Sequence, residues 1–151
     1  MDISAHKEKG EITVNRLPVN KLFESNVRGK LQAKLRNNDT EAYTDEEDGA
    51  KRYIIDLFYL PERNNSNAIE DVMFYLDDTY SDPVRLAERN RDGSFEATIQ
   101  SSGDFVITVE VIAGGRSFRQ QMWLSDMLES GYADTIPSPA VVQAIRELRD
   151  N

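Results

Sequence analysis

The sequence has 151 residues, a net charge of −9 and no cysteine. Its length fits a single domain that can bury a core without disulfides or a structural metal. The acidic balance argues against a general nucleic-acid binder, because phosphate contacts need clustered lysine and arginine. The absence of cysteine excludes disulfides, a thiolate nucleophile and cysteine-based zinc sites.

Nothing in the sequence predicts export or membrane insertion. The first residues, Met1–Glu8, contain no apolar segment of the kind found in secretion signals. The apolar runs along the chain are far shorter than the ~20 residues of a membrane-spanning helix. We therefore expect a cytoplasmic protein that does not bind membranes, and the oligomeric state is left open.

Residues 1–48 are expected to form a partly ordered N-terminal extension. Residues Glu11–Val14 fit a short strand, and the stretch after them fits two patterns. Apolar residues at every fourth position favour a helix, whereas alternation around Leu31–Leu35 favours a strand. A glycine in the middle weakens the helix by about 1 kcal/mol relative to alanine. We expect a short helix near Asn20–Val27 and a strand near Lys30–Arg36.

Charges in this region are segregated. Basic residues cluster from Lys21 to Arg36, and an acidic loop follows from Asp39 to Asp48. One interpretation is a basic docking face paired with the acidic loop. The other is a solvated face followed by a surface loop, which is typical of charge runs, and isolated surface pairs contribute little stability.

Residues 49–130 are expected to form the core of the fold. Aromatic and β-branched residues alternate with polar ones over short runs, and turn residues such as Asp92-Gly93 separate these runs. No helical pattern intervenes, so the spacing predicts an all-β antiparallel sandwich packed through Phe105, Ile107 and Val109. The expected strands span residues 52–60, 72–76, 84–87, 95–99, 105–112 and 118–124.

Residues 131–151 are expected to form a C-terminal helical segment. Ser138 fits the N-cap and Pro139 the first helical position. Arg146 and Arg149 lie in the last turn, where the helix dipole favours cations. The helix either covers the sandwich or docks a partner. Its apolar face comprises Val141, Val142, Ile145 and Leu148.

Trp123 allows two interpretations as well. On a sandwich strand, a single tryptophan often covers a neighbouring helix. Tryptophan is also a frequent anchor at protein interfaces. The sequence favours the covering role.

Several segments of the core are similar to one known family. The segments Arg52–Leu60 and Ile69–Leu76 resemble the opening strands of prokaryotic YEATS domains. The segment Leu76–Val84 resembles the family's Leu-His-Pro-Thr/Ser-Phe loop with its downstream proline. The segment Ser101–Phe105 resembles the Gly-Trp-Gly-Glu-Phe turn, and the hairpin at Gly114-Gly115 completes the resemblance.

This resemblance covers about residues 52–128 and implies an immunoglobulin-like sandwich that binds rather than catalyses. Eukaryotic members read acylated lysine between aromatic side chains at the loop end. Prokaryotic members look like sensor or adaptor modules of conflict systems. Thr79 and Tyr80 match the loop's Thr/Ser and aromatic positions. Gly103 matches the turn glycine, whose backbone can approach a ligand closely.

Three positions depart from the family's pattern. Asp77 stands where the family has His, Asp78 where it has Pro, and Ser102 where it has an aromatic residue. Without that ring, a flat acyl group loses about 1 kcal/mol or more of stacking contact. The two added carboxylates favour a cationic ligand, such as unmodified lysine or arginine. Alternatively, the carboxylates only cap a turn and Tyr80 packs in the core.

An enzyme is the competing class of function. The only histidine, His6, lies in the polar N-terminus, so the common nucleophile–base pairs lack a base. Asp77 and Asp78, with Asp82 or Asp104, could act as an acid–base pair or hold Ca²⁺. However, their spacing fits no EF-hand loop, and turns are rich in such residues. We expect no catalytic residue, no metal and no cofactor.

The sequence therefore predicts a recognition or adaptor module that binds a protein or peptide ligand, with a lysine-type side chain at the loop end. A scaffold that docks through the basic N-terminal segment or the terminal helix is the first alternative. A small carboxylate-based hydrolase is the second. The expected ligand site comprises Asp77, Asp78, Thr79, Tyr80, Ser102, Gly103 and Asp104.

Overall fold

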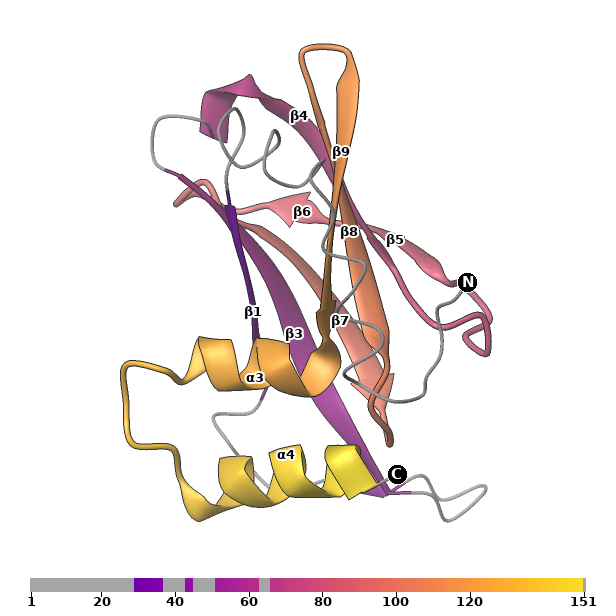
Figure 1. Ribbon diagram of the computed structural model, residues 1–151, viewed down its shortest axis with the longest axis vertical. Helices are drawn as coiled ribbons and strands as arrows, with labels where there is room; N and C mark the ends of the chain where they lie inside the picture. The colour runs from indigo at the N-terminus through magenta and orange to yellow at the C-terminus, as the bar shows by residue number, and fades with distance from the viewer. Residues whose placement is uncertain (1–28, 37–42, 45–50, 63–65, 151) are drawn as a thin grey trace.

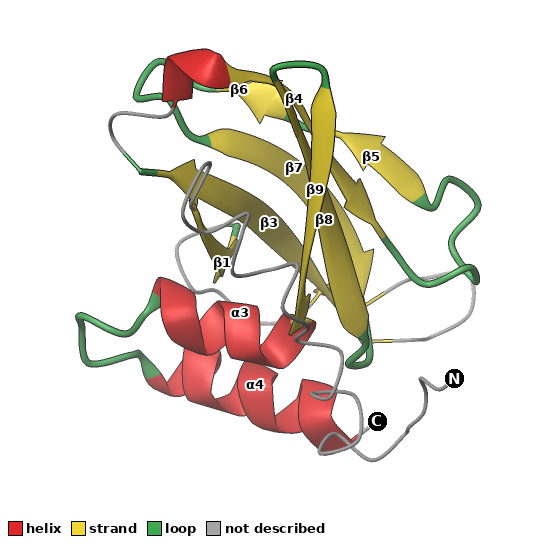
Figure 2. Ribbon diagram, turned by 45° about the horizontal axis from the view of Figure 1, so that its top comes forward, coloured by secondary structure: helices red, strands yellow, loops and turns green. Residues whose placement is uncertain are grey.

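The computed structural model describes residues 29–36, 43–44, 51–62 and 66–150. Within these residues, two antiparallel β-sheets face each other and two helices follow at one end (Figure 1 and Figure 2). The strands are β1 (Gly29–Leu35), β2 (Tyr43–Thr44), β3 (Lys51–Pro61), β4 (Ile69–Tyr75), β5 (Val84–Leu86), β6 (Glu88–Arg89), β7 (Phe95–Ser101), β8 (Val106–Ala113) and β9 (Arg116–Trp123). The helices are α3 (Leu124–Gly131) and α4 (Pro139–Asp150), with a short 3₁₀ turn, η2 (Ser66–Ala68), before β4.

The two sheets have simple strand orders. In the described part of the chain, the first runs β1-β3-β7-β6, with β2 paired to the start of β3, and the second runs β5-β4-β8-β9. The chain passes between the sheets at Ala87, the single residue between β5 and β6. Its N–H donates a hydrogen bond to the carbonyl of Val72 at 2.8 Å, which holds the crossing point against β4. The predicted immunoglobulin-like antiparallel sandwich is confirmed.

The core lies between the sheets, as the alternating pattern requires. Ile55 and Leu57 on β3 are completely buried, and so are Phe74 on β4 and Ile107 and Val109 on β8. Phe105 differs from the expected pattern, because it is half-buried and lies just before β8 rather than within it. This displacement puts its ring beside a loop instead of in the centre of the core.

In the hairpin between β8 and β9, the turn residues determine the strand register. Gly114 and Gly115 have φ angles of 60° and 73°, and two consecutive positive φ values are typical of the type I′ turn that suits antiparallel strands. The turn pairs Ala113 with Arg116 and sets the register of the whole β8–β9 ladder. This hairpin points away from the helices (Figure 1).

The terminal helix begins as expected. The Val141 N–H donates to Ser138 Oγ at 3.3 Å, so Ser138 caps α4. Val141, Ala144 and Leu148 form the buried face, whereas Val142 is exposed.

Helix α3 corrects the sequence analysis, which extended the preceding strand to residue 124. The strand β9 ends at Trp123, and Leu124, Met127 and Leu128 are buried at helical spacing. In the sequence, Leu124 continues the apolar alternation of β9, so the change from a strand pattern to a helix pattern is not visible there. Trp123 is only 4% exposed, so it is not a surface anchor.

Helix α3 lies across β1, and this contact joins the helical end to the first sheet (Figure 2). A Cβ at Gly131 would stand 2.0 Å from the carbonyl oxygen of Ala33, so only glycine allows this approach. The expected strand near residues 30–36 is confirmed as β1. It pairs with β3 in the first sheet, although it belongs to the segment expected to form an N-terminal extension. The expected strand at 11–14, the expected helix at 20–27 and His6 lie outside the described residues.

None of the helices in the described part of the chain is long and apolar enough to cross a lipid bilayer.

Candidate functional site

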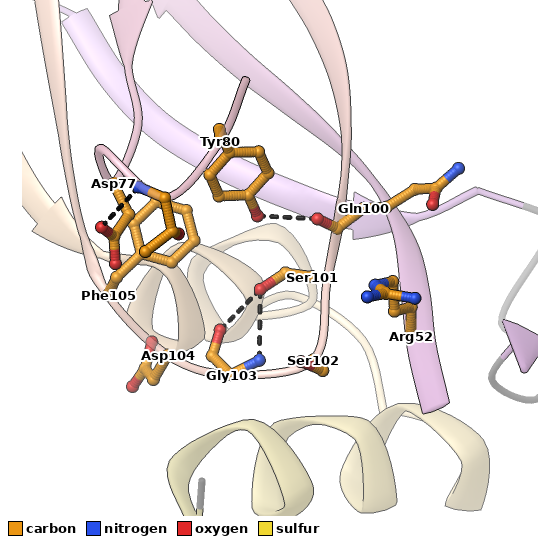
Figure 3. Close-up of a pocket in the computed structure, with 10 residues that line it drawn as sticks. Arg52, Asp77, Tyr80, Gln100, Ser101, Ser102, Gly103, Asp104 and Phe105 are labelled. Carbon is orange, nitrogen blue, oxygen red and sulfur yellow. Dashed lines mark hydrogen bonds between the residues drawn. The ribbon is translucent and has the colours of Figure 1, made fainter. Parts of the chain in front are cut away.

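A pocket of about 440 Å³ lies at one end of the sandwich, where two loops meet (Figure 3). One loop follows β4 and runs from Asp77 to Pro83, and the other connects β7 to β8. The start of β3 completes the wall. The lining residues are Arg52, Asp77, Thr79, Tyr80, Gln100, Ser101, Ser102, Gly103, Asp104 and Phe105.

The structure therefore brings together two segments that the sequence analysis combined into one site. Their ligand-binding role stays a prediction, but their position at a common pocket is a fact of the fold. Asp78 is different, because it is exposed and is not among the lining residues. The predicted residues that line the pocket are Asp77, Thr79, Tyr80, Ser102, Gly103 and Asp104.

Sequence reasoning missed Arg52 and Gln100 as members of the pocket, and it did not single out Ser101 or Phe105. The pairing of β3 with β7 carries the first two there, because Tyr53 lies opposite Ser101 and Ile54 opposite Gln100. No local signal reveals such a register. The sequence did contain a signal for Phe105, because this residue ends the turn Ser101–Phe105 that resembles the family's Gly-Trp-Gly-Glu-Phe.

Tyr80 connects the two loops. Its hydroxyl donates a hydrogen bond to the carbonyl of Gln100 at 2.7 Å, and its ring centroid lies 5.6 Å from that of Phe105, with the rings tilted by 49°. The guanidinium of Arg85 lies 5.8 Å from the centre of the Tyr80 ring, a cation–π distance. Burial raises the pKa of Tyr80, so the phenol stays neutral and remains a donor.

Arg85 also fixes the first loop against β7. Its Nε donates to the carbonyl of Asp82 at 2.7 Å, and its Nη1 donates to the carbonyl of Thr98 at 3.2 Å. One side chain therefore joins the loop, strand β5 and the opposite sheet. The loop that carries Tyr80 is therefore fixed to β7 by two side chains, Tyr80 itself and Arg85.

Asp77 shapes its own loop. Its Oδ1 accepts a hydrogen bond from the Thr79 N–H at 3.2 Å, and its carbonyl accepts one from the Tyr80 N–H at 3.1 Å. This is the local capping that aspartate commonly supplies in turns. The turn-capping interpretation thus applies to Asp77, which nevertheless lines the pocket.

The second loop is a tight turn closed by one hydroxyl. Ser101 Oγ donates to the carbonyl of Gly103 at 2.7 Å and lies 3.2 Å from the Gly103 nitrogen, which donates to it. Ser101 is buried, whereas Ser102 is exposed at the rim. The exposed hydroxymethyl of Ser102 leaves that rim without a ring.

Asp104 faces the helices as well as the pocket. Its Oδ1 accepts from the Ser125 N–H at 2.9 Å, and its Oδ2 accepts from Ser125 Oγ at 2.6 Å. The preceding Trp123 provides no side-chain cap for α3. Asp104 therefore supplies the acceptor that the first turn of this helix needs.

The charges at the pocket are mixed. Arg52 lies on one side of the pocket and Asp77 on the other (Figure 3). The lining thus carries one guanidinium against the carboxylates of Asp77 and Asp104. Among the described residues, no group of three or more His, Asp or Glu side chains is arranged to hold a metal ion.

The fold and the position of the pocket define the class of protein: an immunoglobulin-like β-sandwich with a pocket formed by loops at one end. Residues 53–125 match the model of the prokaryotic YEATS domain, and this part of the chain belongs to that family. The matched stretch contains both pocket loops and strands β4 to β9. It leaves out β1 and α4.

Among solved structures, the chain is similar to one described as the Yaf9 YEATS domain recognizing an H3K122suc peptide. The two share 24% sequence identity with a TM-score of 0.46, over 64% of this chain and 68% of that one. No curated protein matches the sequence.

Proposed function

We propose that this protein is a non-catalytic recognition module that binds a lysine-containing peptide in the loop-end pocket. The observation that carries the proposal is the meeting of the Asp77–Tyr80 and Ser102–Asp104 segments at one cavity, inside a domain of the YEATS family. YEATS domains read acylated lysine, and the two segments are the ones whose resemblance to that family implied a ligand site.

The lining of the pocket favours acylated over unmodified lysine. The expectation of a cationic ligand rested on Asp77 and Asp78, and only Asp77 lines the cavity. Arg52 adds a positive charge on the opposite side, which offsets the attraction of Asp77 for an ammonium group. The other lining carboxylate, Asp104, has both oxygens hydrogen-bonded to Ser125. The rings of Tyr80 and Phe105 offer apolar contact to an acyl chain, and carbonyl and hydroxyl groups nearby can orient its amide.

The carboxylates support binding rather than hydrolysis. A general acid–base pair needs two carboxyl groups aimed at a substrate. Both oxygens of Asp104 accept hydrogen bonds from Ser125, and one oxygen of Asp77 accepts from its own loop. Asp78 and Asp82, the remaining candidates, are not among the residues that line the cavity.

The wider setting remains part of the proposal. We assign the protein to the prokaryotic cytoplasm as an adaptor in a conflict or signalling system, with residues 49–130 as the recognition domain between an N-terminal extension and residues 131–151. The scaffold alternative relied on the basic segment from Lys21 to Arg36, half of which (residues 21–28) lies outside the described residues, or on α4.

Calorimetric titration with matched peptides tests this function. One peptide carries a free lysine, and the others carry the same lysine with a short neutral or a carboxylate-bearing acyl group. We expect saturable binding of an acylated peptide that Tyr80→Ala abolishes. Leu86→Ala serves as the control, because this side chain is 65% exposed on β5 and away from the pocket. Binding that survives Tyr80→Ala would exclude the loop-end site.

A further inference from the structure

A chain of hydrogen bonds connects the candidate pocket to the C-terminal helix. Asp104 accepts two hydrogen bonds from Ser125, as described above. Ser125 Oγ in turn accepts a hydrogen bond from Arg149 Nε at 3.0 Å. A pocket-lining carboxylate is therefore linked through one buried hydroxyl to the last turn of α4.

The orientation of Arg149 is itself fixed. Its Nη1 lies 3.1 Å from Glu129 Oε2, and its Nη2 lies 3.1 Å from Glu129 Oε1 and 2.8 Å from Asp126 Oδ1. Such a two-pronged pairing restricts a guanidinium more strongly than a single contact does. Nε is left pointing at Ser125, whose hydroxyl hydrogen is then directed at Asp104.

The carboxylate of Asp104 has two competing uses. Held by the first turn of α3, it serves as the helix cap, and both of its oxygens are occupied. Released from Ser125, it would present negative charge to the pocket that it lines. A cationic ligand gains from the released state, whereas a neutral ligand does not.

We propose that Ser125 and Arg149 are positioning residues of the pocket, which hold Asp104 on α3 and thereby set the preference for neutral over cationic lysine. This inference rests on the proposed function and assigns the discrimination to residues that never touch the ligand. It also gives α4 a role beyond covering the sandwich, because its last turn fixes a charge at the site.

The first test measures affinities for an acetyl-lysine peptide and for the same peptide with free lysine. In Ser125→Ala, we expect their ratio to move towards free lysine by about fivefold, the change produced by about 1 kcal/mol. Arg149→Ala should move the ratio in the same direction. Arg149→Lys keeps the positive charge for Asp126 and Glu129 but lacks the Nε donor, so it should behave like Arg149→Ala.

A double-mutant cycle separates positioning from general damage to the fold. In an Asp104→Asn background, Ser125→Ala should no longer change the ratio, because the charge that it releases is absent. Arg146→Ala is the matched control, since Arg146 lies one turn earlier on α4 and does not line the pocket. An unchanged ratio in Ser125→Ala, or an equal shift in the Asp104→Asn background, would overturn the proposal.

A ligand-free measurement keeps this inference separate from the proposed function. Amide hydrogen exchange at residues 103–105 should quicken by about fivefold in Ser125→Ala and in Arg149→Lys, but not in Arg146→Ala. If no peptide binds and these rates still change, the recognition function fails while the positioning role stands. Unchanged rates in both variants would refute the positioning role.

Discussion

The Tyr80 hydroxyl donates a hydrogen bond of 2.7 Å to the main-chain carbonyl of Gln100, and so joins the loop after β4 to the end of β7. The loop joins β4 to β5 in one sheet, whereas Gln100 lies on β7 in the other sheet. A hydrogen bond therefore connects the two sides of the sandwich at the end that carries the pocket, where loops replace the apolar core.

This contact predicts a graded response to substitution at Tyr80. Tyr80→Phe should lower the free energy of unfolding by about 0.5–1 kcal/mol, the lower part of the range for a hydrogen bond that solvent can replace. Tyr80→Ala should cost more, because it also removes the ring that packs on Phe105. Urea denaturation of both variants checks the order. Equal losses would show that the ring contributes nothing, and an unchanged stability of Tyr80→Phe would show that the hydroxyl contributes nothing.

The close contact between α3 and β1 predicts that an alanine at position 131 strongly destabilises the fold. Gly131→Ala should lower the free energy of unfolding by about 1–3 kcal/mol, because the added methyl group would meet the backbone of Ala33, which cannot rotate away. Gly114→Ala is the control for backbone strain alone, since its Cβ would have nothing within 4 Å. The account of the contact fails if Gly131→Ala proves the milder of the two in thermal or urea denaturation.

The cap of α4 predicts a smaller effect. Ser138→Ala removes the acceptor for the Val141 N–H and should cost about 1 kcal/mol. Ser138→Asp restores an acceptor and should recover most of that loss. Denaturation midpoints of the two variants provide the measurement, and identical midpoints would argue that α4 gains nothing from its cap.

Glu110 predicts a pH dependence of stability. Hydrogen bonds from Ser117 and Tyr75, both 2.5 Å long, hold the pKa of this carboxyl below its ordinary value of 4.5. A depressed pKa in the folded state contributes stability that is complete above the unfolded pKa and is lost as the pH falls through the folded pKa. Wild type should therefore lose stability more steeply below about pH 5 than Glu110→Gln does. Parallel pH profiles of the urea midpoint would contradict this assignment.

The strands could be predicted because the signals for them lie within short stretches of the sequence. Alternation identified the buried faces of β3, β7 and β8, and paired glycines identified the β8–β9 turn. Helix α3 was not predictable in the same way. Its cap comes from Asp104, 21 residues away in sequence, so no N-cap signal precedes it.

The candidate site followed the same division. The resemblance to the family selected the two loops, because motif residues are contiguous there. Arg52 was missed, since only the register of β3 against β7 carries it to the pocket. Asp78 was included because it stands in the loop that resembles the family's motif and adds a carboxylate there, yet only Asp77 of the two lines the cavity.

The central claim is that the loop end of the sandwich is the recognition surface. Chemical-shift mapping by NMR during titration with an acyl-lysine peptide tests it most directly, because each amide reports its own surroundings. We predict that the largest shifts fall on residues 77–80 and 100–105, the two segments that supply all of the pocket lining except Arg52. Shifts concentrated on α4 and the end of α3 instead, with the two loops unchanged, would contradict the account and favour a docking scaffold.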